Sequence, residues 1–213
     1  MDVDVIPLHS EFINSENVHD KLQSFNGILV APGFGERGVE GKIEAIKYVR
    51  LNNIPFFGIC YGMQMAVIEY ARNMLKLDDA NSTEVNPNTK NPVIDLMEEQ
   101  KNITEKGGTM RLGAWKCDIT RETLCHSVYK TENIEERHRH RYELNNKYLN
   151  QLEENGLVAS GKNKDTNLVE VVEVKEHPWF IGVQYHPEYK STVLSPHPLF
   201  VSFVSAAILN KNK

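Results

Sequence analysis

The sequence is poor in cysteine, in tryptophan and in long apolar runs. Its 213 residues include three cysteines and two tryptophans. Cys60, Cys117 and Cys125 are odd in number and show no CxxC spacing, which favours a reducing, cytoplasmic setting. No apolar stretch approaches the length of a membrane span, and the N-terminal MDVDVIPLHS lacks the basic and apolar regions of a signal peptide. We therefore expect no membrane partner.

Positive charge is also in short supply. Lysine and arginine number 24 against 29 acidic residues, which gives a formal charge of -5 at pH 7. This balance argues against a general nucleic-acid binder. With 40% hydrophobic and 25% charged residues, the composition is that of an ordinary soluble globule. The length suits one domain with a sizeable core, and we see no repeat or linker that would divide residues 1–213.

Alternating strand and helix patterns predict an α/β fold. Apolar runs at 27–33 and 54–60 are each followed by a helical pattern, at 39–52 and from residue 61. This rhythm is typical of an open, mostly parallel sheet with helices on both faces. The pattern also predicts a first strand at 3–8, and a loop at 86–92 within the polar stretch 78–109. An additional β-rich segment is expected from residue 110, with strands at 110–119, 156–162, 168–174 and 180–186 and helices at 146–155 and 197–210.

The segment FFGICYGMQMA places Cys60 where a buried strand ends and a helix begins. Gly58 and Gly62 flank it, a spacing that suits a tight strand-to-helix turn around a nucleophile. The helix N-terminus carries unpaired N–H groups and partial positive charge, so we expect it to favour the thiolate of Cys60. The backbone N–H of Tyr61 is well placed to receive a developing oxyanion. A core cysteine in a βα turn is the alternative, and the G-x-C-x-G spacing alone does not separate the two.

A candidate partner for this thiol lies late in the chain, in GVQYHPEY. His186 and Glu188 stand two apart at the end of a strand-like run, and residues two apart in an extended chain point to the same side. Pro187 between them helps to keep the chain extended. Glu188 would fix the tautomer of His186, which would take the proton of Cys60 and later give it to a leaving amine. The alternative for His-Pro-Glu by itself is a surface turn, since His-Pro occurs twice more in the chain.

Together these motifs resemble the class I glutamine amidotransferases, which use a Cys-His-Glu triad to hydrolyse glutamine to glutamate and ammonia. The segments GILVAPGFGERGVEGKIEAI, IPFFGICYGMQMAVIEYARN, MRLGAW and HPWFIGVQYHPEYKS narrow the resemblance to the glutaminase domain of the CTP synthase family. ERHRHRYELN and DANSTE belong to the same resemblance, and within them ERHRHRYE and NSTE are its most specific parts. The resemblance implies a flavodoxin-like fold. It also implies that Cys60 attacks the side-chain amide of glutamine, with the N–H groups of Gly33 and Tyr61 holding the oxyanion.

The resemblance further implies how glutamine is bound. The residues expected to bind it are Gly33, Tyr61, Gln64, Glu84, Arg141 and Tyr142. Glu84 suits the α-ammonium group, and the guanidinium fork of Arg141 suits the α-carboxylate. Without the triad, Glu84 would read as a solvated loop acid and Arg141 as part of a phosphate or RNA patch in RHRHR. A metal site at His-Arg-His would need a second cluster of ligands at suitable spacing, which the sequence lacks, so we expect no metal.

Two positions depart from the pattern of the family. Where the family usually reads Pro-Gly-Gly-Phe-Gly, this chain reads Ala-Pro-Gly-Phe-Gly over residues 31–35. Pro32 has no N–H and cannot donate to an oxyanion, so we expect an intact hole that uses Gly33 and Tyr61. Tyr61 replaces a leucine that is common in the family. We expect this change to be mild, because the implied role of the residue is through its backbone.

The resemblance also sets the expected partners and cofactors. A CTP synthase needs an amidoligase domain for ATP, magnesium and UTP, and nothing here resembles it, so no cofactor is expected in this domain. The expected partners are L-glutamine and the synthetase domain of the same, homo-oligomeric protein, in which the ammonia would aminate UTP to CTP. The family adds GTP as an activator near the domain junction, with Arg37 and Arg111 as candidate contacts by their place in the motifs.

Three alternatives stay open at this point. The domain could feed a different synthase, or the chain could be a γ-glutamyl hydrolase of the same fold. It could also be a docking or regulatory module with little turnover in isolation, whose oxyanion hole forms only against a synthetase domain.

Overall fold

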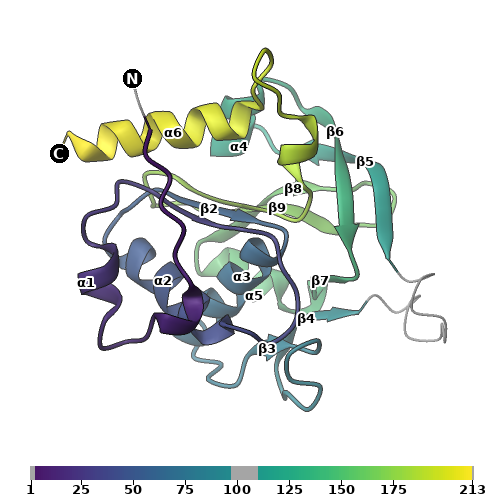
Figure 1. The fold of residues 1–213 in the computed structure, drawn as a ribbon. Coiled ribbons are helices and arrows are strands. Elements are labelled where there is room, and N and C mark those ends of the chain that lie inside the picture. Colours follow the sequence, from purple (N-terminus) through teal and green to yellow (C-terminus); the bar gives the residue numbers. More distant parts are fainter. Residues whose placement is uncertain (1–2, 97–109, 213) are drawn as a thin grey trace.

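A seven-stranded sheet runs through the computed structural model, which describes residues 3–96 and 110–212 (Figure 1). Its strand order is β1 (Ile28–Val30), β2 (Phe56–Ile59), β10 (Phe180–Val183), β9 (Val169–Val174), β8 (Leu157–Lys162), β5 (Arg111–Ile119) and β6 (Asn133–His140). The predicted α/β class with its β-rich segment is confirmed. Within this sheet, parallel pairing is confined to β1, β2 and β10, because the β-rich segment continues the sheet with antiparallel strands.

Helices cover both faces of this sheet, as predicted. One face carries α2 (Val39–Leu51), α3 (Tyr61–Asn73) and α5 (Leu149–Glu154), with α1 (Val18–Leu22) against α2; the other carries α4 (Leu124–Tyr129) and α6 (Pro198–Lys211) (Figure 1). Neighbouring residues of β2 show why both faces need a cover. Phe56 joins the core under α2 and α3, whereas Phe57 contacts the ring of Phe203 in α6. None of the helices within the described residues is long and apolar enough to cross a membrane.

Two stretches differ from the prediction. Residues 3–8 form no strand and are exposed, with Val5 85% exposed, so the alternation of apolar residues there does not mark a buried face. The polar stretch from residue 78 contributes two strands that were not predicted, β3 (Asn81–Ser82) and β4 (Pro92–Leu96), which join β7 (Tyr142–Leu144) in a small second sheet. The predicted loop at 86–92 is confirmed up to residue 91, and residues 97–109 lie outside the described residues. Within 3–96 and 110–212, short 3-10 helices are found at η1 (Ser10–Phe12), η4 (Asn146–Tyr148) and η5 (Pro187–Lys190).

Strand β6 was not predicted, although it carries the ERHRHR motif. Glu136, His138 and His140 are buried, whereas Arg137 and Arg139 between them are exposed. The strand therefore alternates in the usual way, but every position except Ile134 is polar, so hydropathy gives no period of two. The strand ends beside the residues that line the cavity described next.

Candidate active site

Cys60 occupies a sharp corner between β2 and α3. Its backbone angles, φ 51° and ψ -99°, are sparsely populated by residues other than glycine and cost conformational energy. A Cβ atom at Gly58 would lie 2.8 Å from the carbonyl carbon of Gly62, and one at Gly62 would lie 2.2 Å from the carbonyl oxygen of Val30. The G-x-C-x-G spacing is therefore a steric requirement of this corner, and such strained corners typically hold a nucleophile.

The sulfur of Cys60 is shielded from bulk water but borders a cavity of about 580 Å³. The residue is 4% exposed, and burial raises the pKa of its thiol to about 12. The backbone N–H of Tyr61 acts in the opposite direction and lowers this pKa. The predicted effect of the helix N-terminus on this pKa is thus present, but desolvation has the larger effect and favours the thiol. A base must therefore take the proton when the sulfur reacts.

Gln184 contacts this sulfur directly. Its Nε2 donates to Sγ of Cys60 at 3.6 Å, and its Oε1 accepts from Nε2 of Gln64 at 3.3 Å. The side chain of Gln184 is fully buried. This residue was not predicted, although it stands two positions before His186, the same spacing that indicated the His-Glu pair.

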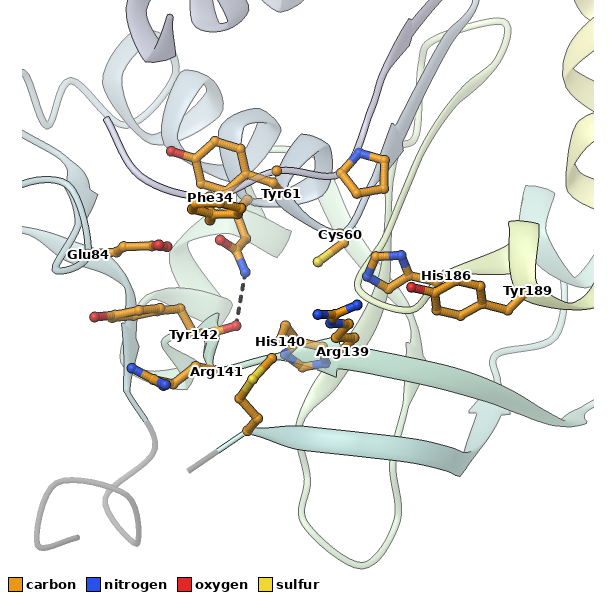
Figure 2. Close-up of a pocket in the computed structure, with 14 residues that line it drawn as sticks. Phe34, Cys60, Tyr61, Glu84, Arg139, His140, Arg141, Tyr142, His186 and Tyr189 are labelled. Carbon is orange, nitrogen blue, oxygen red and sulfur yellow. Dashed lines mark hydrogen bonds between the residues drawn. The ribbon is translucent and has the colours of Figure 1, made fainter. Parts of the chain in front are cut away.

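His186 and Glu188 are in contact, as predicted. Nδ1 of His186 lies 2.6 Å from Oε1 of Glu188, and Nε2 is buried without a hydrogen-bond partner among the described residues. Figure 2 shows the imidazole turned toward the sulfur of Cys60. The extended conformation predicted around Pro187 is wrong, since η5 begins there and its turn brings Glu188 back to the ring. Tyr189 stacks on the imidazole, with the planes 14° apart.

The cavity gathers most of the residues predicted for the site (Figure 2). Its predicted lining residues are Gly33, Cys60, Tyr61, Gln64, Glu84, Arg141, Tyr142 and His186, and its further ones are Pro32, Phe34, Met110, Arg139, His140 and Tyr189. Glu188 is linked to the cavity through His186. The cavity opens where β2 and β10 end, which is the sheet edge at which the sequence places both reactive groups.

One part of the cavity suits the head group of an amino acid. Glu84, Arg141 and Tyr142 lie there together (Figure 2). Nε2 of Gln64 donates to the carbonyl oxygen of Tyr142 at 2.9 Å, and the buried Oε1 of Gln64 has no hydrogen-bond partner within the described residues. An acid, a guanidinium and an available acceptor match the ammonium and carboxylate groups of an amino acid.

The two expected oxyanion donors lie on neighbouring segments. Tyr61 begins α3, where its backbone N–H lowers the pKa of Cys60, and Gly33 lines the cavity on the loop that follows β1. A Cβ atom at Gly33 would lie 3.4 Å from Cδ1 of Tyr61, so this loop packs on the ring. The Tyr61 hydroxyl also donates to the carbonyl oxygen of Gly35. The purely backbone role expected for Tyr61 is therefore incomplete.

A buried ionic cluster lies behind the cavity. The guanidinium of Arg111 is 2.6 Å from Glu170 and 3.6 Å from Glu143, and Nδ1 of His138 is 2.7 Å from Nε2 of His140. Burial raises the pKa of both carboxyl groups, and it lowers the pKa of His138 to about 2 and that of His140 to about 3. Arg111, predicted as a possible GTP contact, is 4% exposed and ion-paired, so this placement speaks against that role.

The other candidate GTP contact, Arg37, is at the surface. Its side chain is 77% exposed, and its Nη2 lies 2.5 Å from Oε2 of Glu11. A GTP contact there stays a prediction. Among the described residues, no three histidine, cysteine or acidic side chains are placed to hold a metal ion. The two histidines of the His-Arg-His motif instead bond to each other inside the ionic cluster.

Comparisons with known proteins agree with this geometry. The family model described as glutamine amidotransferase class-I matches residues 1–206, and the chain belongs to that family. Within the family, the chain is 68% identical over 206 residues to the CTP synthase of Flavobacterium johnsoniae and 63% identical over 205 residues to that of Christiangramia forsetii. These alignments cover 97% and 96% of this chain but 38% of the length of either relative. The chain therefore spans less than half the length of these curated relatives.

A solved structure shows which domain of a CTP synthase the chain resembles. The glutaminase domain of Trypanosoma brucei CTPS, solved with bound acivicin, superposes with a TM-score of 0.91 at 38% identity. The match covers 98% of this chain and 81% of that chain. The resemblance to the glutaminase domain of CTP synthases, inferred from the motifs, is thus confirmed.

Proposed function

We propose that the chain is the ammonia-producing part of a CTP synthase and hydrolyses L-glutamine to glutamate and ammonia. One observation carries this proposal. Cys60, on its strained corner, and His186, whose imidazole Glu188 orients, line the same cavity. The 68% identity to a CTP synthase supports the use of the ammonia for amination of UTP to CTP. The ATP, magnesium and UTP needed for that step would bind outside this chain.

The proposed reaction begins with a proton transfer. Because burial keeps Cys60 protonated, Nε2 of His186 takes the proton as the sulfur attacks the amide carbon. Glu188 stabilises the resulting imidazolium. The N–H groups of Gly33 and Tyr61 stabilise the oxyanion.

Collapse of the tetrahedral intermediate then releases ammonia. The imidazolium of His186 gives its proton to the departing nitrogen, and the γ-glutamyl group stays on Cys60 as a thioester. A water molecule that loses a proton to His186 attacks the thioester carbonyl. The second tetrahedral intermediate expels the sulfur, which recovers its proton from the imidazolium, and glutamate leaves. Through both stages Glu84 and Arg141 would hold the amino-acid end of the substrate.

The test is glutamate release together with mapping of a covalent adduct. Wild-type protein should release glutamate from glutamine, and a glutamine-like chloroketone should modify Cys60. Cys60→Ala should abolish both results, whereas Cys117→Ala and Cys125→Ala, which alter buried thiols away from the cavity, should keep them. Undiminished hydrolysis by Cys60→Ala, or labelling at another residue, would contradict the proposal.

The same assay tests two of the three alternatives. Preference for γ-glutamyl peptides over glutamine would indicate a γ-glutamyl hydrolase. Rapid modification of Cys60 without glutamine turnover would indicate a docking module that needs a synthetase domain. Homo-oligomeric assembly, a cytoplasmic location and activation by GTP stay predictions.

A further inference from the structure

Tyr61 contacts the loop of one expected oxyanion donor, Gly33, and its own backbone N–H is the other. Its hydroxyl donates to the carbonyl oxygen of Gly35 on the loop that carries Gly33. We propose that the Tyr61 side chain is a positioning group that fixes the spacing between the two oxyanion donors before glutamine binds. This inference rests on the proposed hydrolysis at Cys60 and deepens it.

The hydroxyl of Tyr61 acts at the turn of this loop. The chain leaves β1 at Val30 and turns at Gly35, which has a φ of +72°. The Gly35 carbonyl oxygen accepts from the Tyr61 hydroxyl, and the Gly35 N–H donates to Oε1 of Glu84 at 3.0 Å. Both polar backbone groups of this one residue are therefore held by side chains that line the cavity.

The ring of Tyr61 packs against the same loop. The residue is 1% exposed, and its Cδ1 lies 3.4 Å from the place where a Gly33 side chain would begin. At the start of the loop, the carbonyl oxygen of Val30 packs so closely on Gly62 that no side chain fits there. The first two residues of α3 thus hold both ends of the segment that contains Gly33. Figure 2 shows Phe34 of this segment beside Tyr61.

Lys42 extends the support along the loop. Its Nζ lies 5.7 Å from the centre of the Tyr61 ring, within range of a cation–π contact. The same Nζ donates to the carbonyl oxygens of Arg37 at 3.0 Å and Gly38 at 3.3 Å. The backbone from Gly35 to Gly38 is therefore tied to α2 and α3 at three carbonyl groups.

This arrangement matters because Pro32 reduces the choice of donors. A proline has no N–H, so the loop depends on Gly33 for its contribution to the hole. The leucine that the family usually has at position 61 can pack on the loop but cannot bond to Gly35. Since negative charge develops on the oxygen in the transition state, loss of the Tyr61 hydroxyl should lower kcat and leave KM nearly unchanged.

The experiment compares Tyr61→Phe and Tyr61→Leu with wild type in the full 213-residue chain. For each protein, kcat and KM for glutamine are measured. The inactivation rates by a glutamine-like chloroketone, whose carbonyl needs the hole, and by iodoacetamide, which does not, are measured alongside. We expect both variants to lose roughly tenfold in kcat and in chloroketone inactivation, with KM and the iodoacetamide rate within about twofold. The matched control is Tyr48→Phe, whose exposed hydroxyl contacts His19, and it should behave as wild type.

Each outcome decides a separate point. An active wild type with unchanged kcat and chloroketone inactivation in Tyr61→Phe would overturn the positioning role and leave the proposed hydrolysis intact. Equal slowing with both reagents would also overturn it, since the change would then lie in the thiol. If Tyr61→Phe does not fold, Tyr61→Leu decides by the same rates. A wild type that reacts with iodoacetamide but neither hydrolyses glutamine nor reacts with the chloroketone would overturn the proposed function itself.

Discussion

The buried amide of Gln184 donates to the sulfur of Cys60 at 3.6 Å. The same amide accepts from Gln64 at 3.3 Å, so one residue joins the nucleophile to a group that lines the cavity. A hydrogen bond to sulfur favours the thiolate over the thiol, and Gln184 accordingly lowers the pKa of Cys60 against the larger effect of burial. The reactivity of the thiol should therefore depend on this contact.

Gln184→Met keeps the volume of the side chain and removes the donor. We expect the reaction of Cys60 with iodoacetamide at pH 8 to slow by about tenfold, because a hydrogen bond to a charged group is lost. The measurement is the alkylation rate as a function of pH. Gln151→Met, at an exposed position of α5, is the control. A pH profile identical to that of wild type would show that the contact does not tune the thiol.

Glu188→Gln tests the orientation of the imidazole. An amide cannot stabilise the imidazolium and can hold the wrong tautomer, so kcat should fall by about 10²- to 10⁴-fold with little change in KM. Steady-state glutamate release gives both constants. Glu154→Gln, an exposed change in α5, should leave them unaltered. A kcat within tenfold of wild type would remove Glu188 from the triad.

Arg141→Lys tests the binding of the substrate carboxylate. Lysine keeps the charge but loses the two-pronged contact, so KM for glutamine should rise by about ten- to a hundredfold while kcat changes less. The control is Arg121→Lys at the surface, where Arg121 pairs with Glu132. An unchanged KM would place the carboxylate elsewhere in the cavity.

Arg111→Met tests the buried ionic cluster. Removing the guanidinium leaves Glu143 and Glu170 buried without their counter-charge, so the free energy of unfolding should fall by about 3–5 kcal/mol. Urea unfolding gives this value. The exposed Arg37→Met should show no measurable change in stability. Equal stability of wild type and Arg111→Met would mean that the cluster adjusts its protonation at no cost.

The buried histidines should make stability depend on pH. Burial lowers the pKa of His138 to about 2, whereas its ordinary value is 6.5. Stability from such a lowered pKa is present above pH 6.5 and is lost as the pH falls toward the folded value, because only the unfolded chain takes up the proton. The raised pKa values of Glu143 and Glu170 act in the opposite sense, since their contribution is present at acid pH and is lost as the pH rises through the folded values.

A variant comparison isolates the contribution of His138. The stability cost of His138→Gln, relative to wild type, should shrink by about 2 kcal/mol between pH 7.5 and pH 5. Urea unfolding at the two pH values measures it, with the exposed His9→Gln as control. A cost that is the same at both pH values would show that His138 can accept a proton in the folded protein.

Local patterns were sufficient for the elements that carry the reactive groups. The strand before Cys60 and the helix after it were predicted because an apolar run, two glycines and a helical stripe lie within a few residues of each other. The pairing of His186 with Glu188 followed from their spacing, although a turn rather than an extended chain brings them together. Strand β6 was missed because the buried side chains of its inner face are polar and form ion pairs and hydrogen bonds. A hydropathy pattern therefore does not distinguish them from exposed residues.

By itself, the sequence determined the corner at Cys60, the order of the main elements and the family, since each depends on residues close together in the chain. Only the tertiary structure decided that the resting sulfur is a thiol, that Gln184 contacts it, and that Arg111 is internal. Desolvation and ion pairing depend on which distant strands enclose a group. For Arg111 these are β7 and β9, whose carboxylates lie 32 and 59 positions further along the chain (143 − 111 and 170 − 111).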